Sequence, residues 1–319
     1  MNVLKSFFLS VIIIVCSASA MSAQTEQYYA ILRTLDNAKV LDLANTKITY
    51  SLTFVADSSK PKEKRSDLKI LLIGDSIQHF YSHYARLKDS IVTEDNKKTG
   101  TGKLPSFPTG VSAEWYDIYN NYPARKQTTI GNITNFNMYV YNEDLADFPK
   151  WNITADTTMI LTYLCYKATC HYHGRNWEAW FTLDIPLNAG PWKLRGLPGL
   201  ILKANDDRQH YVFECNGIEK LKIRKPILMY QMAYGAASSK THAGTRETYL
   251  KDLRQFYENY VNSLLASGCT VYLVDDSGKI MEIIETPNTK FADRNMGFGR
   301  KVNARDRNKK IPYNPIELE

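Results

Sequence analysis

The chain has 319 residues, of which 44% are hydrophobic and 23% are charged, so it is long enough to fold around a substantial core. Its 21 tyrosines favour β-structure. The net charge of +7 is modest, and much of it lies in residues 60–69 and 300–310, which are loop-like in composition. These charges are typical of solvated loops, so we expect no nucleic-acid partner.

The first 23 residues have the pattern of a cleaved secretory signal. An apolar region at residues 7–15 follows a positively charged start and is far shorter than the ~20 residues of a membrane span. Small residues follow this apolar region, and they allow cleavage after Ala20 or after Ala23. Val15 precedes Cys16 where lipoprotein processing needs a small residue. We therefore predict a periplasmic or secreted protein with no transmembrane segment.

Alternating apolar and polar residues predict that residues 24–287 form a single β-rich domain. Ile48, Tyr50, Leu52 and Phe54 alternate with polar residues, which indicates a half-buried strand. Because no long helix interrupts the predicted strands, we expect them to pair antiparallel. Further strands are predicted at residues 69–73, 138–141, 159–166, 177–185, 200–203 and 211–215, with an irregular crossing at 106–135.

Residues 70–76 resemble the first sequence block of GDSL-type esterases, in which a strand delivers a nucleophilic serine, here Ser76. Asp207 and His210 have the spacing of the Asp-x-x-His pair of those enzymes. That chemistry needs a base, an acid and oxyanion donors around the serine. The Gly-x-Asn-Asp block and the βαβ rhythm are missing, and the Asp-x-x-His falls mid-chain. A hydrolase using Ser76 is therefore an alternative, and we assign no catalytic residue.

Four cysteines follow the predicted signal: Cys165, Cys170, Cys215 and Cys269. An even number in an exported protein suggests two disulfides, with three connectivities. Cys165 and Cys170 are close enough in sequence to bond across a kinked turn, although their odd spacing places them on opposite faces of a straight strand. The sequence thus predicts at least one bridge without assigning its partners.

His171 and His173 would point to the same face of a strand, as two metal ligands should. Neither a third ligand nor a cysteine pair at zinc spacing stands nearby, although His210 or Asp206 could approach in the fold. A histidine pair on the surface or on an edge strand is the favoured interpretation. We expect no metal or other cofactor and keep a metal-binding protein using these histidines as an alternative.

Arg175 and the nearby tryptophans are the candidate ligand-binding residues. Arg175 and Asp184 could pair across neighbouring strands, and the tryptophans could form an aromatic platform for an anionic ligand. The competing interpretation is that the tryptophans fill the core. The candidate ligand-binding set is Arg175, Trp180, Asp184 and Trp192.

The run at residues 190–202 combines turn-forming and large apolar residues. Pro198 sets φ for a turn, Gly199 can take the positive φ of a type II turn, and Leu197 before a proline avoids the helical region. We therefore predict a buried β-turn that sets the register of two core strands. The structural motif residues are Gly190, Pro191, Gly196, Leu197, Pro198 and Gly199.

Residues 245–267 carry the apolar stripe of an amphipathic helix, with Thr245 as N-cap and Gly268 as stop. We expect this one long helix to pack on the sheet. A hairpin follows, with strands at 270–274 and 279–284 and a turn at 275–278. Residues 288–319 are predicted to form a basic, loosely held tail.

The ordered motifs from about residue 151 to 215 resemble the GLPGLI family of exported Gram-negative bacterial proteins. They include Trp151-x-Ile153, Cys165, residues 167–169, Gly174-Arg175, 179–182, 184–186, Gly190-Pro191 and 196–201. Residues 76–82 and 313–318 also look similar to that family. The resemblance implies export and a β-rich fold, and it implies no reaction.

These observations predict a mainly β (α+β) protein with a curved antiparallel sheet, for which a half-barrel is our specific expectation by analogy of fold. They favour a non-enzymatic cell-envelope protein that binds a ligand, such as apolar cargo, or an outer-membrane or periplasmic protein. A purely structural partner of an outer-membrane complex is a further alternative.

Overall fold

The computed structural model describes residues 32–33, 38–99, 116–134, 137–229, 232–233, 241–266, 270–285, 299–310 and 312–318. The predicted signal peptide, Gly268 and Cys269 lie outside these ranges. Within them, no helix is both long and apolar enough to cross a membrane.

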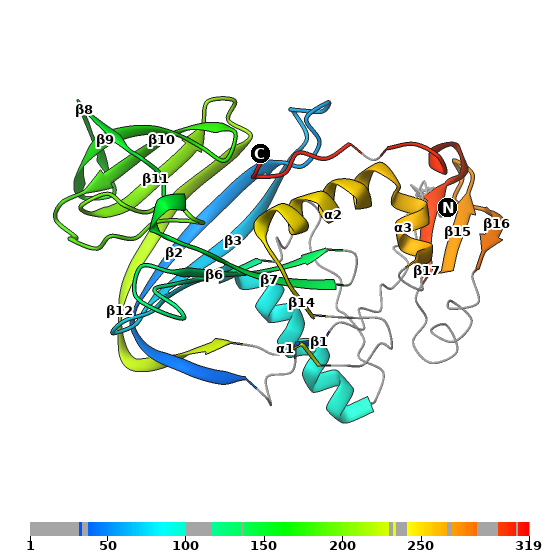
Figure 1. Ribbon diagram of the computed structural model, residues 1–319, viewed down its shortest axis with the longest axis horizontal. Coiled ribbons are helices and arrows are strands. Elements are labelled where there is room, and N and C mark those ends of the chain that lie inside the picture. The colour runs from blue at the N-terminus through cyan, green and yellow to red at the C-terminus, as the bar shows by residue number, and fades with distance from the viewer. Residues whose placement is uncertain are drawn as a thin grey trace, which may run out of the picture.

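One sheet of 12 strands dominates the fold (Figure 1). Its order is β14-β7-β6-β5-β4-β3-β2-β12-β11-β10-β9-β8, and all neighbours are antiparallel except β14 and β7. The strands are β2 (Lys39–Val55), β3 (Lys64–Ile73), β4 (Gln78–Ser82), β5 (Tyr116–Asn120), β6 (Thr128–Thr134), β7 (Asn137–Glu143), β8 (Asn152–Ile160), β9 (Tyr163–Tyr172), β10 (Arg175–Thr182), β11 (Leu200–Asp206), β12 (Tyr211–Met229) and β14 (Thr241–Ala243).

The remaining elements are smaller. A three-stranded sheet has the order β16-β15-β17, and β1 pairs with β13. Short 3₁₀ turns occupy Leu145–Asp147 and Ala304–Asp306. The bounds are β1 (Leu32–Arg33), β13 (Met232–Ala233), β15 (Thr270–Val274), β16 (Ile280–Ile284), β17 (Gly299–Asn303), α1 (His83–Thr99), α2 (Arg246–Glu258) and α3 (Tyr260–Ala266).

Strand β2 is the centre of the large sheet, with β3 on one side and β12 on the other. Ile48, Tyr50, Leu52 and Phe54 are all buried, so the strand predicted from their alternation is confirmed. The Tyr50 hydroxyl donates a hydrogen bond to the carbonyl oxygen of Ile201 at 2.7 Å. This bond ties the central strand to the run at residues 190–202.

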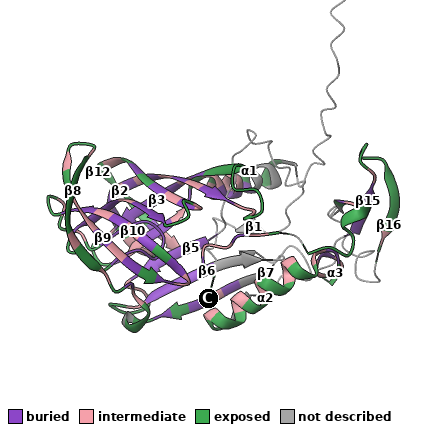
Figure 2. Ribbon diagram, turned by 90° about the horizontal axis from the view of Figure 1, so that it is seen from above, coloured by how far each residue is buried: buried purple, intermediate pink, exposed green. Residues whose placement is uncertain are grey.

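The main core lies between the sheet and the crossing segment, residues 183–199, which connects β10 to β11. Trp192, Leu194 and Leu197 are buried there, and the ring centroids of Trp177 and Trp192 are 5.5 Å apart. Figure 2 shows this buried region running along β2, β3 and β10. The apolar residues of the motif therefore fill the core.

The expected half-barrel and the single long C-terminal helix are both wrong. The sheet ends at β14 and at β8, which do not pair with each other, so it does not close. Residues 245–267 instead contain two helices, because the chain departs from helical geometry at Asn259, whose φ is −127°. Thr245 caps α2 as predicted, by accepting a hydrogen bond from the Thr248 N–H.

The two helices differ in what they cover. None of the residues of α2 is buried, whereas α3 buries Val261 and Leu264 against the small sheet. The apolar stripe is continuous in sequence, but its second part packs on β15 and β17. Periodicity alone does not say which sheet a helix covers, and this is why the prediction failed.

Helix α1 was not predicted from the sequence. Its buried residues include Asp89 and Thr93, and Ala85 is its one buried hydrophobic residue among those whose burial the structure describes. A polar buried face gives no hydrophobic periodicity, so the usual signal of a helix is weak here.

The predicted turn at Pro198-Gly199 needs correction. Gly199 does not have a positive φ, and Gly196 does, at +104°. Gly199 is required for a different reason, because a Cβ atom there would lie 1.9 Å from the carbonyl oxygen of Thr182. The motif thus holds β11 against the end of β10 by close backbone contact.

Candidate functional site

The C-terminal segment at residues 312–318 lies within the tail that the sequence predicts to be loosely held. It returns from the small sheet along α2 to the main sheet, as Figure 1 shows in red. The rings of Tyr257 and Tyr313 stack at 4.2 Å, and the Leu318 N–H donates to the carbonyl oxygen of His173 at 3.1 Å. The segment is therefore anchored at both ends, and two charged clusters lie along it.

The turn between β9 and β10 positions one of these clusters. His173 and Gly174 have φ values of 49° and 75°, and Tyr172 pairs with Arg175 across them. Two residues with positive φ make the tight hairpin turn that matches the twist of the strands. Because His173 lies in the turn, its side chain does not follow the alternating faces of the strand. Its ring centroid lies 4.0 Å from that of Tyr172.

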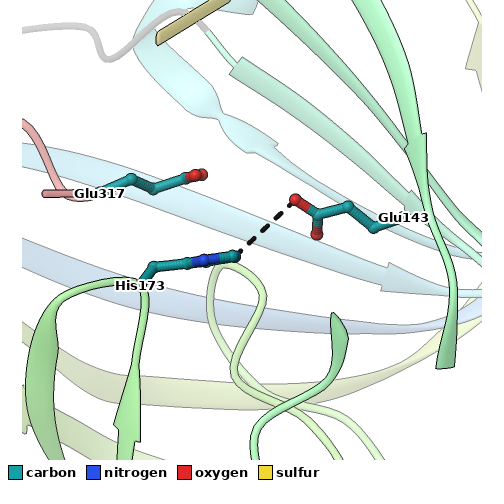
Figure 3. Close-up of side chains that lie close together, drawn as sticks. All are labelled: Glu143, His173 and Glu317. Atoms are coloured by element: carbon teal, nitrogen blue, oxygen red, sulfur yellow. Dashed lines mark ion pairs between the residues drawn. The ribbon is translucent and has the colours of Figure 1, made fainter. Parts of the chain in front are cut away.

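His171 and His173 consequently do not share a face. His171 is exposed, and its Nδ1 lies 2.9 Å from Oδ1 of Asn176. The side chain of His173 is 11% exposed and points towards Glu143 and Glu317 (Figure 3). The structure therefore separates the predicted pair and groups His173 with two carboxylates from distant parts of the chain.

The cluster of Glu143, His173 and Glu317 has the donor types of a metal site. Its three potential ligand atoms lie within 4.8 Å of one another. One imidazole and two carboxylates suit zinc and related ions. However, Nζ of Lys193 lies 2.5 Å from Oε1 of Glu143 and 2.6 Å from Oε1 of Glu317. An ammonium group thus already lies between the carboxylates.

The charges of this cluster balance without a metal ion. Lys193 and Arg246, whose Nε lies 2.5 Å from Oε2 of Glu317, neutralise the two glutamates. Burial lowers the pKa of His173 to about 3, so its ring is neutral. Burial raises the pKa of Glu143 despite Lys193, whereas for Glu317 the surrounding positive groups, Lys193 foremost, together outweigh burial and lower the pKa. The cluster joins β7, the crossing segment, α2 and the C-terminal segment.

Arg175 forms the second cluster and uses its donors within the chain. Its guanidinium donates to Asp206 Oδ2 at 2.7 Å and to Asn314 Oδ1 at 2.8 Å. It also donates to the carbonyl oxygens of Pro315 and Ile316 at 2.5 and 2.9 Å. Arg175 and Asp206 are fully buried. This candidate ligand-binding residue therefore holds the C-terminal segment.

The other predicted ligand-binding residues lie apart. Trp192 is buried in the core, while Trp180 lies on the opposite face of β10 from Trp177 and donates from Nε1 to Glu178. Asp184 is exposed, and its own N–H donates to Thr182 Oγ1. Because Asp184 does not pair with Arg175, the structure does not assemble the predicted aromatic and charged site.

Ser76 and His210 lie at opposite ends of β2. The Ser76 N–H donates to the Asp42 carboxylate, and the His210 carbonyl accepts from Val55 N–H, each at 2.8 Å. The 13 residue steps from Asp42 to Val55 span roughly 40 Å of extended strand. The structure does not bring the predicted nucleophile and base together.

The described cysteines are free thiols. Cys165, Cys170 and Cys215 are all buried and unbridged, contrary to the predicted disulfide. Burial raises the pKa of Cys170 to about 12 and that of Cys215 to about 11. These side chains are core residues in the described part of the chain.

The comparisons with known proteins cover parts of the chain. A family described as "Protein of unknown function (Porph_ging)" matches residues 172–203, which include the Gly196–Ile201 run. No curated protein matches the chain. The match does not test membership of the GLPGLI family, which stays a resemblance.

Solved structures of PNGF-II in the space groups P21 and C2 show a partial likeness. The sequence identities are 18% and 16%, over 66% and 73% of this chain, and both TM-scores are 0.42. The chain covers 33% and 36% of PNGF-II in the two comparisons, about a third of its length. A likeness of this size assigns neither fold nor function.

Sequence reasoning missed most of the charged residues that meet at the C-terminal segment. Glu143 and Arg246 belong to no motif, and Lys193 lies in the run at residues 190–202 without being a predicted site residue. The signal that could have found Glu317 was the family-like run at residues 313–318, whose place in the fold the sequence does not show.

Proposed function

We propose that this chain is an exported, non-enzymatic cell-envelope protein that binds an extended segment of another envelope protein through the edge strand β8. The leader-like residues 1–23 and the resemblance to GLPGLI proteins support export. The expectation of apolar cargo depended on a half-barrel that the sheet does not form. The observation that carries the proposal is the exposure of β8.

Strand β8 is the last strand of the large sheet, and β9 is its one strand neighbour among the described residues. Seven of its nine residues are exposed, as Figure 2 shows at this edge. An edge strand presents main-chain donors and acceptors that an extended segment of another protein can pair with. The register shift between Ile153 and Thr157 leaves Thr157–Ile160 as the regular part of this edge.

Large apolar side chains lie beside that regular part. Met159 and Leu164 face each other across the β8–β9 pair, and Leu161 lies in the turn between them. Their exposed fractions are 61%, 43% and 53%. We name Met159, Leu161 and Leu164 the hairpin tip. A partner strand on β8 would cover part of the tip and gain apolar burial in addition to main-chain hydrogen bonds.

The charge of the edge favours a different protein over a second copy of this chain. Asp156 is exposed within the register shift. An antiparallel pair centred on β8 would place Asp156 opposite its own copy, and one centred on Thr157–Ile160 would place it opposite Leu161. Like charges or an apolar residue opposite a carboxylate are unfavourable. The partner strand should therefore carry a Lys or Arg opposite Asp156.

Site-specific photocrosslinking in intact cells tests this proposal. A benzophenone amino acid in place of Thr158 should give one adduct, with an exported protein other than this chain. M159K and D156R should remove the adduct. I223K is the matched control, because Ile223 is also apolar and is 84% exposed on β12. Reversing the opposing basic residue of the identified partner should restore the adduct with D156R.

Three outcomes would overturn the proposal. The first is an adduct with a second copy of this chain, which would indicate self-association. The second is an adduct that M159K and D156R leave unchanged. The third is a yield from position 158 no higher than from a benzophenone placed at Ile223. Circular dichroism of each purified variant shows that the fold is kept.

Metal binding at Glu143, His173 and Glu317 is a second candidate function. It is favoured by Nε2 of His173, which is buried without a hydrogen-bond partner and lies 3.8 Å from Oε1 of Glu143. Zinc would have to displace the Lys193 ammonium group. Calorimetric titration with Zn²⁺ should then show binding that K193M strengthens and H173N removes. Equal heats for wild type and H173N would eliminate this candidate.

A further inference from the structure

Arg195 occupies a fixed position in the crossing segment. Its carbonyl oxygen accepts a hydrogen bond from Trp151 Nε1 at 2.8 Å. The next residue, Gly196, has a positive φ, and its N–H donates to Asn188 Oδ1 at 2.7 Å. The backbone is thus held on both sides of Arg195, and its side chain is directed inward, leaving the residue 7% exposed.

The guanidinium of Arg195 is buried without an anion. Its Nη2 donates to Asn121 Oδ1 at 3.3 Å, and the group lies 4.5 Å from the ring centroid of Phe148. Nε and Nη1 are buried with no hydrogen-bond partner. Over the ranges that the structure describes, no carboxylate lies within ion-pair distance of this side chain.

Other buried cations of the chain are arranged differently. Lys69, Arg175 and Lys193 each have a carboxylate oxygen within 2.9 Å. A buried charge is normally paired, and a guanidinium has five N–H donors. Arg195 uses one donor and leaves the others for a fork-shaped contact, the geometry with which arginine binds carboxylate and phosphate.

We propose that Arg195 is an anion-binding residue, whose guanidinium takes one oxyanion group, a phosphate or a carboxylate. The ligand would accept from Nη1, or from Nε on the other edge of the guanidinium, in each case together with the neighbouring Nη2, and would neutralise the buried charge. Phe148 covers one flat face of the guanidinium and is itself only half-buried, which leaves the N–H donors in the plane of the group for the anion. This site is independent of the proposed contact at β8.

Thermal unfolding of the purified protein with defined anions tests the proposal. Inorganic phosphate and acetate, each titrated against chloride at constant ionic strength, distinguish a phosphate ligand from a carboxylate ligand. At ten times its Kd, the preferred anion should raise the melting temperature of wild type by about 2 °C. R195M should show no such rise, and R208M, which changes an exposed arginine, should respond like wild type.

In buffer without phosphate or acetate, the difference in melting temperature between R195M and wild type should vanish or favour R195M. R195M removes an uncompensated buried charge while keeping a long side chain, so it should melt at or above the temperature of wild type. The proposal is overturned if neither anion shifts wild type more than R195M does. It is also overturned if R195M and R195Q both melt well below wild type without anion, since Arg195 would then be satisfied by the chain itself.

Discussion

Gly199 allows the most direct test of how the motif works. The sequence suggests that this glycine supplies a positive φ, whereas the structure places its Cα against the Thr182 carbonyl, 1.9 Å from where a Cβ would lie. Thr182 is fully buried and pairs with Leu200. Changing Gly199 to alanine should therefore force the end of β10 away from the start of β11.

The expected size follows from the geometry. Contact between a Cβ and a carbonyl oxygen needs about 3.2 Å, so the two backbones must separate by roughly 1.3 Å in a close-packed core. Overpacking costs about 1–3 kcal/mol, and a contact with backbone should lie at the upper end, near 3 kcal/mol. For a chain of this length, that lowers the melting temperature by about 4–5 °C.

Two other glycines serve as matched controls. G196A should cost only about 1 kcal/mol, because Gly196 has the positive φ but the nearest atom to its Cβ position is 3.6 Å away. A Cβ on Gly217 would meet nothing within 4 Å, so G217A should be neutral or slightly stabilising. Urea unfolding should therefore rank the losses as G199A, then G196A, then G217A. A loss for G199A no larger than that for G196A would refute the close-contact explanation.

Three further predictions concern buried polar groups. R175M should lower the free energy of unfolding by about 3–5 kcal/mol and expose the C-terminal segment to proteolysis, because it leaves Asp206 unpaired. Adding D206N to R175M should recover part of this stability, and no recovery would argue against the ion pair. His173 has a pKa of about 3 in the folded state against 6.5 when unfolded, so the free energy of unfolding should fall by about 2 kcal/mol from pH 7 to pH 5. In H173N, whose asparagine tolerates the left-handed φ, urea unfolding should lack this fall, and the same pH dependence in H173N and wild type would contradict the prediction. In a C269S variant lacking residues 1–23, Cys165, Cys170 and Cys215 should react with a thiol reagent only after unfolding. A mass of the intact protein two daltons below that of the three-thiol form would instead indicate a disulfide.

Strands with one buried face were predictable because their pattern is local. The alternation of Ile48, Tyr50, Leu52 and Phe54 has a single physical solution, a strand with one face in the core. The hairpin with strands at residues 270–274 and 279–284 was predictable for the same reason, since β15 and β16 pair across the expected turn. By contrast, α1 buries Asp89 and Thr93, and a polar face gives no such pattern.

The charged clusters were not predictable, because their members come from distant segments. The sequence makes Arg175 a candidate ligand-binding residue, whereas in the structure it binds Asp206 and the segment around Asn314. The sequence separation between Arg175 and Asn314 is 139 residues, so no local pattern connects them. His173 was selected for a strand face that the turn at Gly174 removes.

The motif and the C-terminal segment form one structural unit, and this bears on where function should be sought. Gly199 and Arg175 lie at opposite ends of β10. Gly199 packs the end of the crossing segment against Thr182, and Arg175 binds residues 314–316. Both use their special chemistry on contacts within the chain. Arg195 differs, because its position is fixed in the same segment while its charge has no counterpart among the described residues. A fold that pairs its other deep cations so closely has no structural need for an unpaired one, and this contrast makes Arg195 the first residue to test for a ligand.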